Sequence, residues 1–306
     1  MNRNANNYPR DMVGYGRKRP DPRWPGKARL AVQFVINYEE GGENCVLHGD
    51  AASEAFLSEI IGAQPWPGQR HMNMESFYEY GSRVGFWRLY RAFTERAIPV
   101  TVFAVAMAMQ RNPEAVAAML EAEWEIASHG YRWIDYHDVD EATEREHMQK
   151  ALALHTELTG AEPLGWYLGR THERTRDILL ETTTPLYDAD AYADDLPYWI
   201  EGRQGAPHLI VPYTLDVNDM RFATNQGFNS GEQFFTYLKD SFDVLYAEGE
   251  SMPGMMSVGL HCRLVGRPGR MAALLRFLDY VRGFDDVWLC TRAEIARHWH
   301  THHAPA

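Results

Sequence analysis

Leu30-Ala31-Val32-Gln33-Phe34-Val35-Ile36-Asn37-Tyr38-Glu39-Glu40-Gly41-Gly42 is the segment from which the fold can be inferred. Residues 30–36 are apolar apart from Gln33, which is typical of a buried strand. Two glycines follow and end the strand. We therefore expect a buried strand that delivers Glu39 and Glu40 at its C-terminal end.

Downstream of this strand, apolar segments alternate with helical patterns. The predicted strands are 98–104, 124–127, 164–168, 186–190, 209–215, 255–261 and 287–290. The predicted helices are 82–96, one opening at Asn112-Pro113, 141–159, 173–182, 231–248, 268–282 and one at the C-terminus. About eight strands alternating with helices predict an α/β fold of parallel units closed as a barrel. A doubly wound open sheet is the alternative, disfavoured because no G-x-G-x-x-G follows a strand.

The domain organisation follows from the prolines and glycines. Residues 1–29 are predicted to form an N-terminal arm, because Pro20, Pro22 and Pro25 block regular structure, and 30–306 a single domain. Residues 43–80 read as a long irregular loop, and such loops often serve as lids or binding loops.

Composition excludes several classes of partner. The formal net charge of −12 disfavours nucleic acid and anionic membrane surfaces, both of which favour a basic face. The three cysteines, Cys45, Cys262 and Cys290, are widely spaced, which indicates reduced thiols. We find no apolar run suited to secretion or to a membrane span, so we expect a cytoplasmic protein.

Polar residues gather where the predicted strands end, which is where parallel barrels carry their chemistry. They are Glu39, Glu40, His129, Arg170, Asp216, Asn218, Asp219, His261 and Arg263. Two nearby carboxylates favour general acid–base work, and an imidazole can protonate a leaving nitrogen. Each residue also has a plainer interpretation: solvated loop carboxylates, core or backbone-bonded histidines, a rim salt bridge for Arg170, and turn residues for 216–219.

Several other active-site patterns fail on inspection. His172-Glu173-Arg174-Thr175-Arg176 begins like a zinc-protease helix but has Arg176 where the second histidine is required. We find no G-x-S-x-G elbow, and Cys262 should point away from His261 on a strand. The histidines at residues 298–303 could bind metal adventitiously, at a terminus where fraying is expected.

The segment Ser128-His129-Gly130-Tyr131-Arg132-Trp133 argues against a metal site. A divalent metal would need a second imidazole one helical turn beyond His129, and Trp133 stands there. An indole N–H has no lone pair to offer a metal. His129 and Glu40 would leave at most two good ligands, whereas catalytic zinc sites usually have three.

These segments resemble the polysaccharide deacetylase family over about residues 30–290. Tyr38-Glu39-Glu40-Gly41 stands where the family has an aromatic residue, a base aspartate, a metal-binding aspartate and glycine. His129 and Trp133 stand where the family has two metal-binding histidines, and Leu260-His261 matches the motif of its catalytic acid. The family's Arg-Pro motif is not cleanly present near residues 167–170.

These departures, with Tyr8-Pro9-Arg10-Asp11-Met12-Val13-Gly14-Tyr15-Gly16, resemble the family's bacterial allantoinase-type branch. That resemblance implies a distorted (β/α) barrel of the deacetylase type, a homotetramer, and opening of the hydantoin ring of allantoin to allantoate without a bound metal or cofactor. It implies Glu39 as base and His261 as acid. His129, Arg170 or a backbone N–H would hold the oxyanion, and Trp133 would pack on the ureide ring.

Three interpretations therefore stay open at this point. The first is an allantoin-opening amidohydrolase with Glu39, His261 and His129 as catalytic residues and Glu40, Trp133, Arg170, Asp216 and Asn218 as substrate contacts. The second is a metal-dependent saccharide N-deacetylase, or a hydrolase of another cyclic imide or ureide. The third is a catalytically inactive barrel used for binding or assembly.

Overall fold

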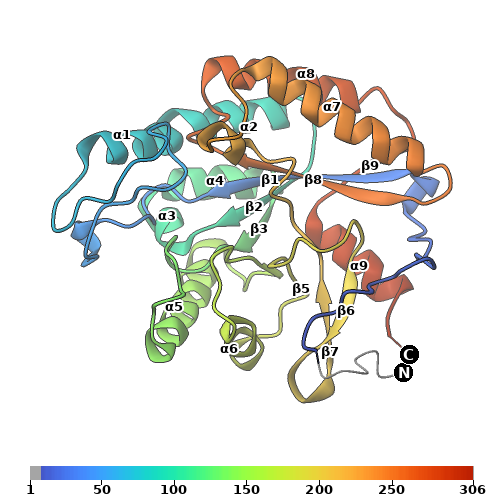
Figure 1. The fold of residues 1–306 in the computed structure, drawn as a ribbon, viewed down its shortest axis with the longest axis horizontal. Coiled ribbons are helices and arrows are strands. Elements are labelled where there is room, and N and C mark those ends of the chain that lie inside the picture. Colours follow the sequence, from blue (N-terminus) through green and yellow to red (C-terminus); the bar gives the residue numbers. More distant parts are fainter. Residues whose placement is uncertain (1–7, 306) are drawn as a thin grey trace.

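The fold is built around one curved sheet, described for residues 8–305 by a computed structural model (Figure 1). Its strands run in the order β6-β7-β5-β4-β3-β2-β1-β8, and β9 also pairs with β1. The strands are β1 (Leu30–Tyr38), β2 (Val100–Ala104), β3 (Glu125–Ser128), β4 (Gly165–Trp166), β5 (Tyr187–Asp188), β6 (Tyr198–Glu201), β7 (Pro207–Ile210), β8 (Gly254–His261) and β9 (Val287–Leu289). All neighbouring pairs are parallel except β6 and β7.

Helices cover the outer side of this sheet (Figure 1). They are α1 (Met72–Tyr80), α2 (Phe86–Thr94), α3 (Ala106–Arg111), α4 (Pro113–Glu121), α5 (Glu141–Thr159), α6 (Thr175–Thr182), α7 (Gly231–Glu248), α8 (Pro268–Val281) and α9 (Arg292–His302). Short helical turns lie at Pro25–Lys27, Val46–His48, Arg203–Gly205 and Asp219–Ala223, and a π-helical turn at Gly81–Gly85 joins α1 to α2. Within residues 8–305, no helix has the length and apolar character needed to cross a membrane.

Strand β1 organises the sheet. It is buried along its whole length, because it pairs with β2 on one edge and with β8 on the other. Its register with β8 sets Asn37 opposite His261. The residues that follow Asn37 and those around His261 are therefore brought to the same place, at the C-terminal end of the sheet.

The sheet is a curled half-barrel, not the fully closed barrel that the alternating pattern predicts. The ends of the strand order are β6 and β8, and within residues 8–305 the seam beside β8 is crossed by one isolated bridge, between Asn218 and Gly259. The β6–β7 pair is an antiparallel hairpin, which a parallel barrel cannot continue. The α/β class and the distorted single barrel are confirmed.

The N-terminal arm lies across this seam in its described part, residues 8–29. The Trp24 indole donates to the carbonyl of Gly254 at the start of β8, and the Tyr15 hydroxyl to the carbonyl of Pro197 before β6. The predicted fraying of the C-terminal histidines is wrong for α9, which stays helical to His302. His298 places its Nε2 2.8 Å from the carbonyl oxygen of Pro22.

Most predicted elements are confirmed, including the Asn112 cap of α4 and the left-handed Gly160 that ends α5. The expected irregular loop 43–80 is wrong at its end, because α1 begins at Met72 with His71 as its cap. Helix α3 and strand β6 were not predicted. Strand β6 lies at the sheet edge and is only half-buried, so it lacks the apolar pattern of the inner strands. All three cysteines are unpaired, as expected.

Candidate active site

A cavity of about 480 Å³ opens at the C-terminal ends of the strands. It is lined by Asn37, Glu39, Phe56, Leu57, His129, Trp133, Asp135, Tyr167, Leu168, Gly169, Arg170, Tyr192, Tyr213, Leu215, Asn218, Met220 and His261. Six of the eight predicted site residues are therefore in its wall: Glu39, His129, His261, Trp133, Arg170 and Asn218. The lining combines ionisable groups with aromatic rings, which is typical of a site for a small polar molecule.

Glu39 lies between two imidazoles at the inner end of this cavity. Its Oε1 is 3.3 Å from Nε2 of His129 and 3.5 Å from Nε2 of His261. Its Oε2 is 2.7 Å from Nη1 of Arg263. Glu39 is 1% exposed and is reached only through the cavity, so its charge is balanced by protein groups and not by bulk water. The predicted grouping of Glu39, His129 and His261 is thus present in the fold.

The pKa values of this group are shifted in opposite directions. Burial raises the pKa of Glu39, but Arg263, His261 and the His129 contact together hold it well below its usual range. Burial lowers the pKa of His261, but the carboxylates of Glu39 and Asp219 outweigh it and raise the pKa to about 9. At neutral pH the site therefore contains a carboxylate beside an imidazolium, which is one group in basic form and one in acid form.

Asp219 and Arg263 support this arrangement; the sequence placed both at strand ends but assigned neither a role in the site. Asp219 is buried, its Oδ1 is 2.6 Å from Nδ1 of His261, and its Oδ2 accepts the backbone N–H groups of His261 and Val265. Arg263 is held between the rings of Tyr78 and Trp133, and its Nε donates to the carbonyl of Leu57. The sequence signal for both was only their position at a strand end.

Glu40 is turned away from the cavity. Its side chain packs against Gly81, where an added Cβ would lie 2.3 Å from Oε1, and it accepts backbone N–H groups from Glu39 and Arg263. It lines a different cavity, together with Glu43, Cys45 and Tyr78. The placement of Glu40 does not support the predicted contact with substrate, because consecutive residues after a strand project to opposite sides.

Trp133 and Arg170 form one wall of the cavity. Trp133 is buried and stacks on Phe56 with ring centroids 6.0 Å apart. The guanidinium carbon of Arg170 lies 4.1 Å from the centroid of the Trp133 ring and 4.7 Å from that of Phe56. The plainer interpretation of Arg170 as a rim salt bridge is weak, because its nearest carboxylate oxygen, on Glu54, is 3.9 Å away.

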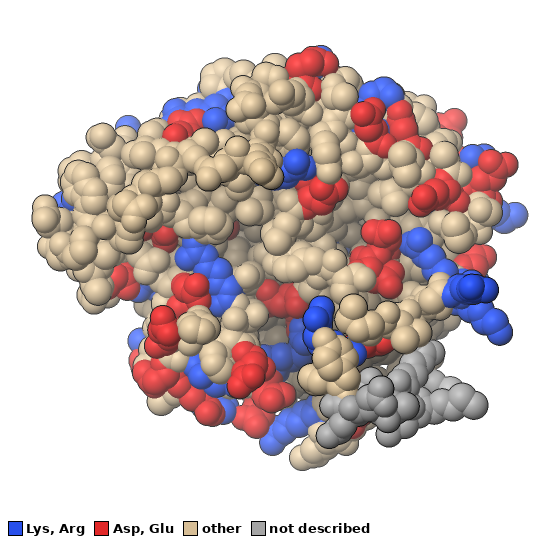
Figure 2. All heavy atoms as spheres, in the orientation of Figure 1, with Lys and Arg blue, Asp and Glu red and all other residues tan. Residues whose placement is uncertain are grey.

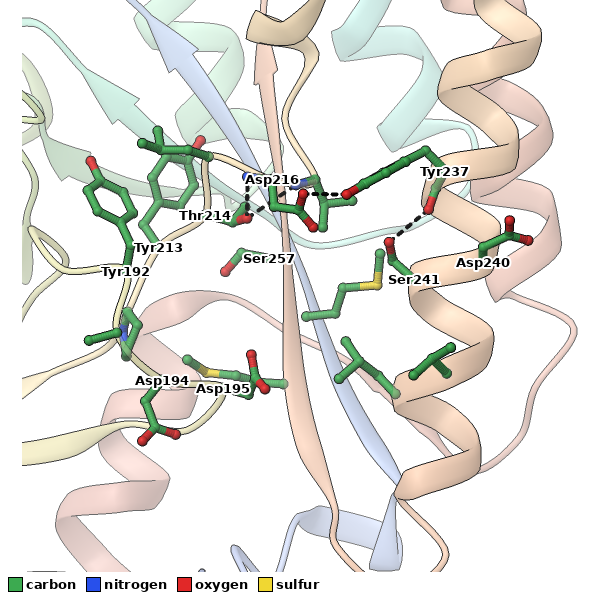
Figure 3. A pocket seen from close by; sticks show the side chains of 18 residues that line it. Tyr192, Asp194, Asp195, Tyr213, Thr214, Asp216, Tyr237, Asp240, Ser241 and Ser257 are labelled. Atoms are coloured by element: carbon green, nitrogen blue, oxygen red, sulfur yellow. Dashed lines mark hydrogen bonds between the residues drawn. The ribbon is translucent and has the colours of Figure 1, made fainter. Parts of the chain in front are cut away.

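Asp216 and Asn218 are separated by the fold although they lie close in sequence. Asn218 lines the cavity and caps the turn that carries Asp219. Asp216 belongs to another hollow of about 830 Å³, between α7 and β8, where it accepts a hydrogen bond from the Tyr237 hydroxyl (Figure 3). The lining of that hollow includes four aspartates but no histidine, so it is not a second copy of the site. The predicted role of Asp216 in the active cavity is therefore not supported.

The donor set does not fit a catalytic divalent metal. Trp133 offers no lone pair, Glu40 is directed toward Gly81, and Nε2 of His129 faces Glu39. Among residues 8–305, no group of three or more His, Cys, Asp or Glu side chains is placed to share a metal ion. Cys262 is not a candidate nucleophile, since burial raises the pKa of its thiol well above the usual value.

The chain is a half-barrel with a carboxylate and two imidazoles at the ends of its strands. These features place it in the class of hydrolases with the deacetylase fold. The chain belongs to the polysaccharide deacetylase family. Residues 74–182 match the family model for polysaccharide deacetylase. A Schizosaccharomyces pombe protein whose name places it among the polysaccharide deacetylases is 42% identical, over 96% of this chain and 98% of its own length.

Two solved structures resemble the whole chain. A "probable polysaccharide deacetylase" from Pseudomonas aeruginosa PAO1 is 62% identical with a TM-score of 0.96, over 98% of this chain and 100% of its own. PuuE allantoinase is 60% identical with a TM-score of 0.96, over 98% of this chain and 99% of its own. The chain is thus similar throughout to a structure named as a deacetylase and to one named as an allantoinase.

Proposed function

We propose that this protein is an amidohydrolase that opens the hydantoin ring of allantoin to give allantoate. One observation carries the proposal: Trp133 forms a wall of the cavity where a metal-dependent deacetylase requires a metal-ligating imidazole. The similarity to PuuE allantoinase over nearly the whole chain supports the same substrate. A flat cyclic ureide also suits a small cavity lined by aromatic rings.

Ring opening requires water to attack an amide carbonyl carbon and the C–N bond then to break. The Glu39 carboxylate takes a proton from the water as the C–O bond forms, which produces a tetrahedral oxyanion. Nε2 of His261 then gives a proton to the departing ring nitrogen. Because Oε1 of Glu39 is 3.5 Å from Nε2 of His261, the proton gained by Glu39 can return to His261. The carboxylic acid product ionises and releases one proton.

The remaining groups position these two and balance charge. Asp219 holds Nδ1 of His261, which fixes the ring with Nε2 toward Glu39. His129 contacts the same oxygen of Glu39 as His261 does, through its Nε2, so its Nδ1, which has no hydrogen-bond partner among residues 8–305, is the nitrogen left to donate to the oxyanion. Removal of one such donor typically costs about 3 kcal/mol in the barrier.

Saccharide N-deacetylation is the second candidate, because a relative that is 62% identical is named as a deacetylase. Both reactions are water attack on an amide, so the catalytic groups alone do not separate them. One purified sample should be assayed with allantoin, hydantoin, cyclic imides and acetylated chito-oligomers. We expect ring opening of allantoin and no release of acetate; acetate release without ring opening would contradict the proposal.

Metal removal tests the same proposal independently. We expect protein stripped of metal by exhaustive chelation, and checked by elemental analysis, to open allantoin at a rate within about twofold of the untreated sample. The reason is that no three side chains of the described residues are placed to bind one metal ion, as a catalytic zinc site usually requires. Complete loss of activity that stoichiometric zinc, cobalt or manganese restores would overturn this expectation and favour the deacetylase.

A further inference from the structure

Arg170 stacks on two aromatic rings in the cavity wall while one of its donors, Nη2, has no hydrogen-bond partner in the described part of the chain. Its guanidinium lies against the rings of Trp133 and Phe56, which fix the plane of the group. Nη2 is buried and has no hydrogen-bond partner among residues 8–305. A buried donor without a partner is costly, so such a donor in a binding cavity points to a ligand acceptor.

The neighbouring carboxylate pairs with Arg170 but does not accept a hydrogen bond from it. Glu54 is 3.9 Å away at its nearest oxygen, which is too far for a hydrogen bond. Both oxygens of Glu54 are already engaged: Oε1 accepts the N–H groups of Ala55 and Phe56, and Oε2 accepts the side-chain amide of Asn44. Glu54 therefore fixes residues 44, 55 and 56 and leaves Nη2 of Arg170 without a hydrogen-bond partner among residues 8–305.

The side-chain contacts of Arg170 differ from those of the catalytic groups. Arg263 also lies against Trp133, at 4.9 Å, and is paired with Glu39, so the catalytic groups are joined to Trp133 through Arg263. Within residues 8–305 the guanidinium of Arg170 contacts Trp133, Phe56 and Glu54, and it makes no ion pair with Glu39. Arg170 is thus placed to bind a part of the substrate other than the bond that breaks.

The chemistry of that part follows from Asp135, which lines the same cavity and is exposed. One of its oxygens accepts the N–H of His137, and a carboxylate has further acceptor sites. A neutral planar urea group offers a carbonyl to Arg170 and N–H groups to Asp135. A carboxylate group would satisfy Arg170 but would be repelled by Asp135. The pair therefore favours the urea.

We propose that Arg170, together with Asp135, forms a specificity subsite for a urea group carried on the substrate outside the ring that opens. This inference rests on the proposed function and extends it, because it predicts that allantoin, with its ureido tail, binds better than unsubstituted hydantoin. A site built around a hydrogen bond discriminates strongly against a substrate that lacks the partner group.

The test measures binding, so that it does not depend on turnover. Dissociation constants for allantoin, hydantoin and hydantoin-5-acetate are measured by calorimetry on full-length Glu39→Gln protein, alone and combined with Arg170→Gln. Arg203→Gln, at an exposed arginine outside the cavity lining, is the matched control. We expect allantoin to bind about 30-fold tighter than hydantoin, and Arg170→Gln to reduce this ratio to about threefold or less without weakening hydantoin. Arg203→Gln should leave the ratio unchanged.

Two further results complete the test. Asp135→Asn should improve binding of the anionic hydantoin-5-acetate relative to allantoin, since it removes the repulsion. Equal binding of allantoin and hydantoin to the parent protein, or an equal loss for both in Arg170→Gln, would overturn the subsite. Failure of the proposed function is seen separately, as absence of ring opening by the wild-type protein.

Discussion

Glu39 is buried and yet ionised, and this property follows from three cationic or donor groups around one carboxylate. Arg263 contacts one oxygen, and the two imidazoles contact the other. A carboxylate held this way is a weaker base than an ordinary one, so the site must compensate at the leaving group. The imidazolium of His261, with its raised pKa, is the group that can do so.

The roles of Glu39 and His261 lead to a direct prediction. Glu39→Gln and His261→Ala should each lower kcat for ring opening by about 10²–10⁴, the usual contribution of a general acid or base. Circular dichroism and thermal melting should show that both variants remain folded. A folded variant with near-native turnover would refute the role assigned to that residue.

The pKa shifts predict the shape of the pH–rate profile. Activity requires ionised Glu39 and protonated His261. The acid limb should therefore lie below the ordinary range of a glutamate, and activity should fall on the alkaline side near pH 9. Asp219→Asn removes a carboxylate that raises the pKa of His261, so it should move the alkaline limb toward neutral pH. An unmoved limb would show that His261 is not the acid, provided that chemistry limits the rate.

At the scale of single residues, the sequence identified Glu39, His129 and His261 but not Asp219 and Arg263, which pair with His261 and Glu39. Glu39, His129 and His261 could be predicted because each follows an apolar strand. The sequence argument chose Asp216 and Asn218 and left out Asp219, because all three suit a turn and only packing against β8 selects Asp219 for His261. Arg263 was missed as a partner, since its pairing with Glu39 depends on the register of β1 with β8.

At the scale of elements, the π-helical turn Gly81–Gly85 packs against two residues that neighbour the site, Glu40 and Cys262. A Cβ at Gly81 would lie 2.3 Å from Oε1 of Glu40, and one at Gly85 would lie 2.0 Å from the carbonyl oxygen of Cys262. The turn therefore packs closely against the residues that follow β1 and those that follow β8. Turns of this kind are frequent at functional sites.

Gly85→Ala should consequently damage both stability and activity. Overpacking against the Cys262 carbonyl should cost about 1–3 kcal/mol of unfolding free energy, and a displaced His261 should lower kcat at least about tenfold. Gly269→Ala in α8 is the matched control, because an added Cβ there meets nothing within 4 Å. Denaturant melts and kinetics on both variants check this. Equal behaviour of the two would contradict the packing argument.

The same turn explains why the sequence placed the helix start wrongly. The regular alternation of helices and strands sets in at Ser82, so the sequence predicts a helix over 82–96, whereas the helical segment begins ten residues earlier, at Met72. In the fold α1, the π turn and α2 follow one another without interruption, because the glycines allow close approach to Glu40 and Cys262. That contact joins distant parts of the chain and cannot be read from local pattern.

At the scale of the whole molecule, one end is poor in charge. Figure 2 shows few charged side chains over the end formed by α1 and the preceding loop. Several large apolar side chains of this region are exposed: Leu47, Phe56, Ile61, Trp66 and Met72. The net charge of the chain is −12, so charged surfaces of two copies repel each other. A surface with few charged side chains is the one at which this repulsion is weakest. Self-association, if it occurs, should use this end.

The homotetramer implied by the family resemblance stays a prediction, and this end of the molecule supplies a test of it. Light scattering at micromolar concentration should give a tetramer for the wild type and smaller species for Ile61→Asp, which is half-exposed there. Leu120→Asp, at an exposed position on α4, should leave the assembly intact. A monomeric wild type would refute the tetramer; an intact Ile61→Asp tetramer would place the interface elsewhere.

The pairing of β1 has a consequence for synthesis of the chain on the ribosome. Strand β1 is made before its partners β8 and β9, which lie at residues 254–261 and 287–289. Until these are translated, one edge of an apolar strand has no partner, and unpaired edges promote aggregation. The pairing of β1 can therefore be completed only once residues 254–289 have been made, and a chain truncated before β8 would leave Glu39 without the strand that brings His261 to it.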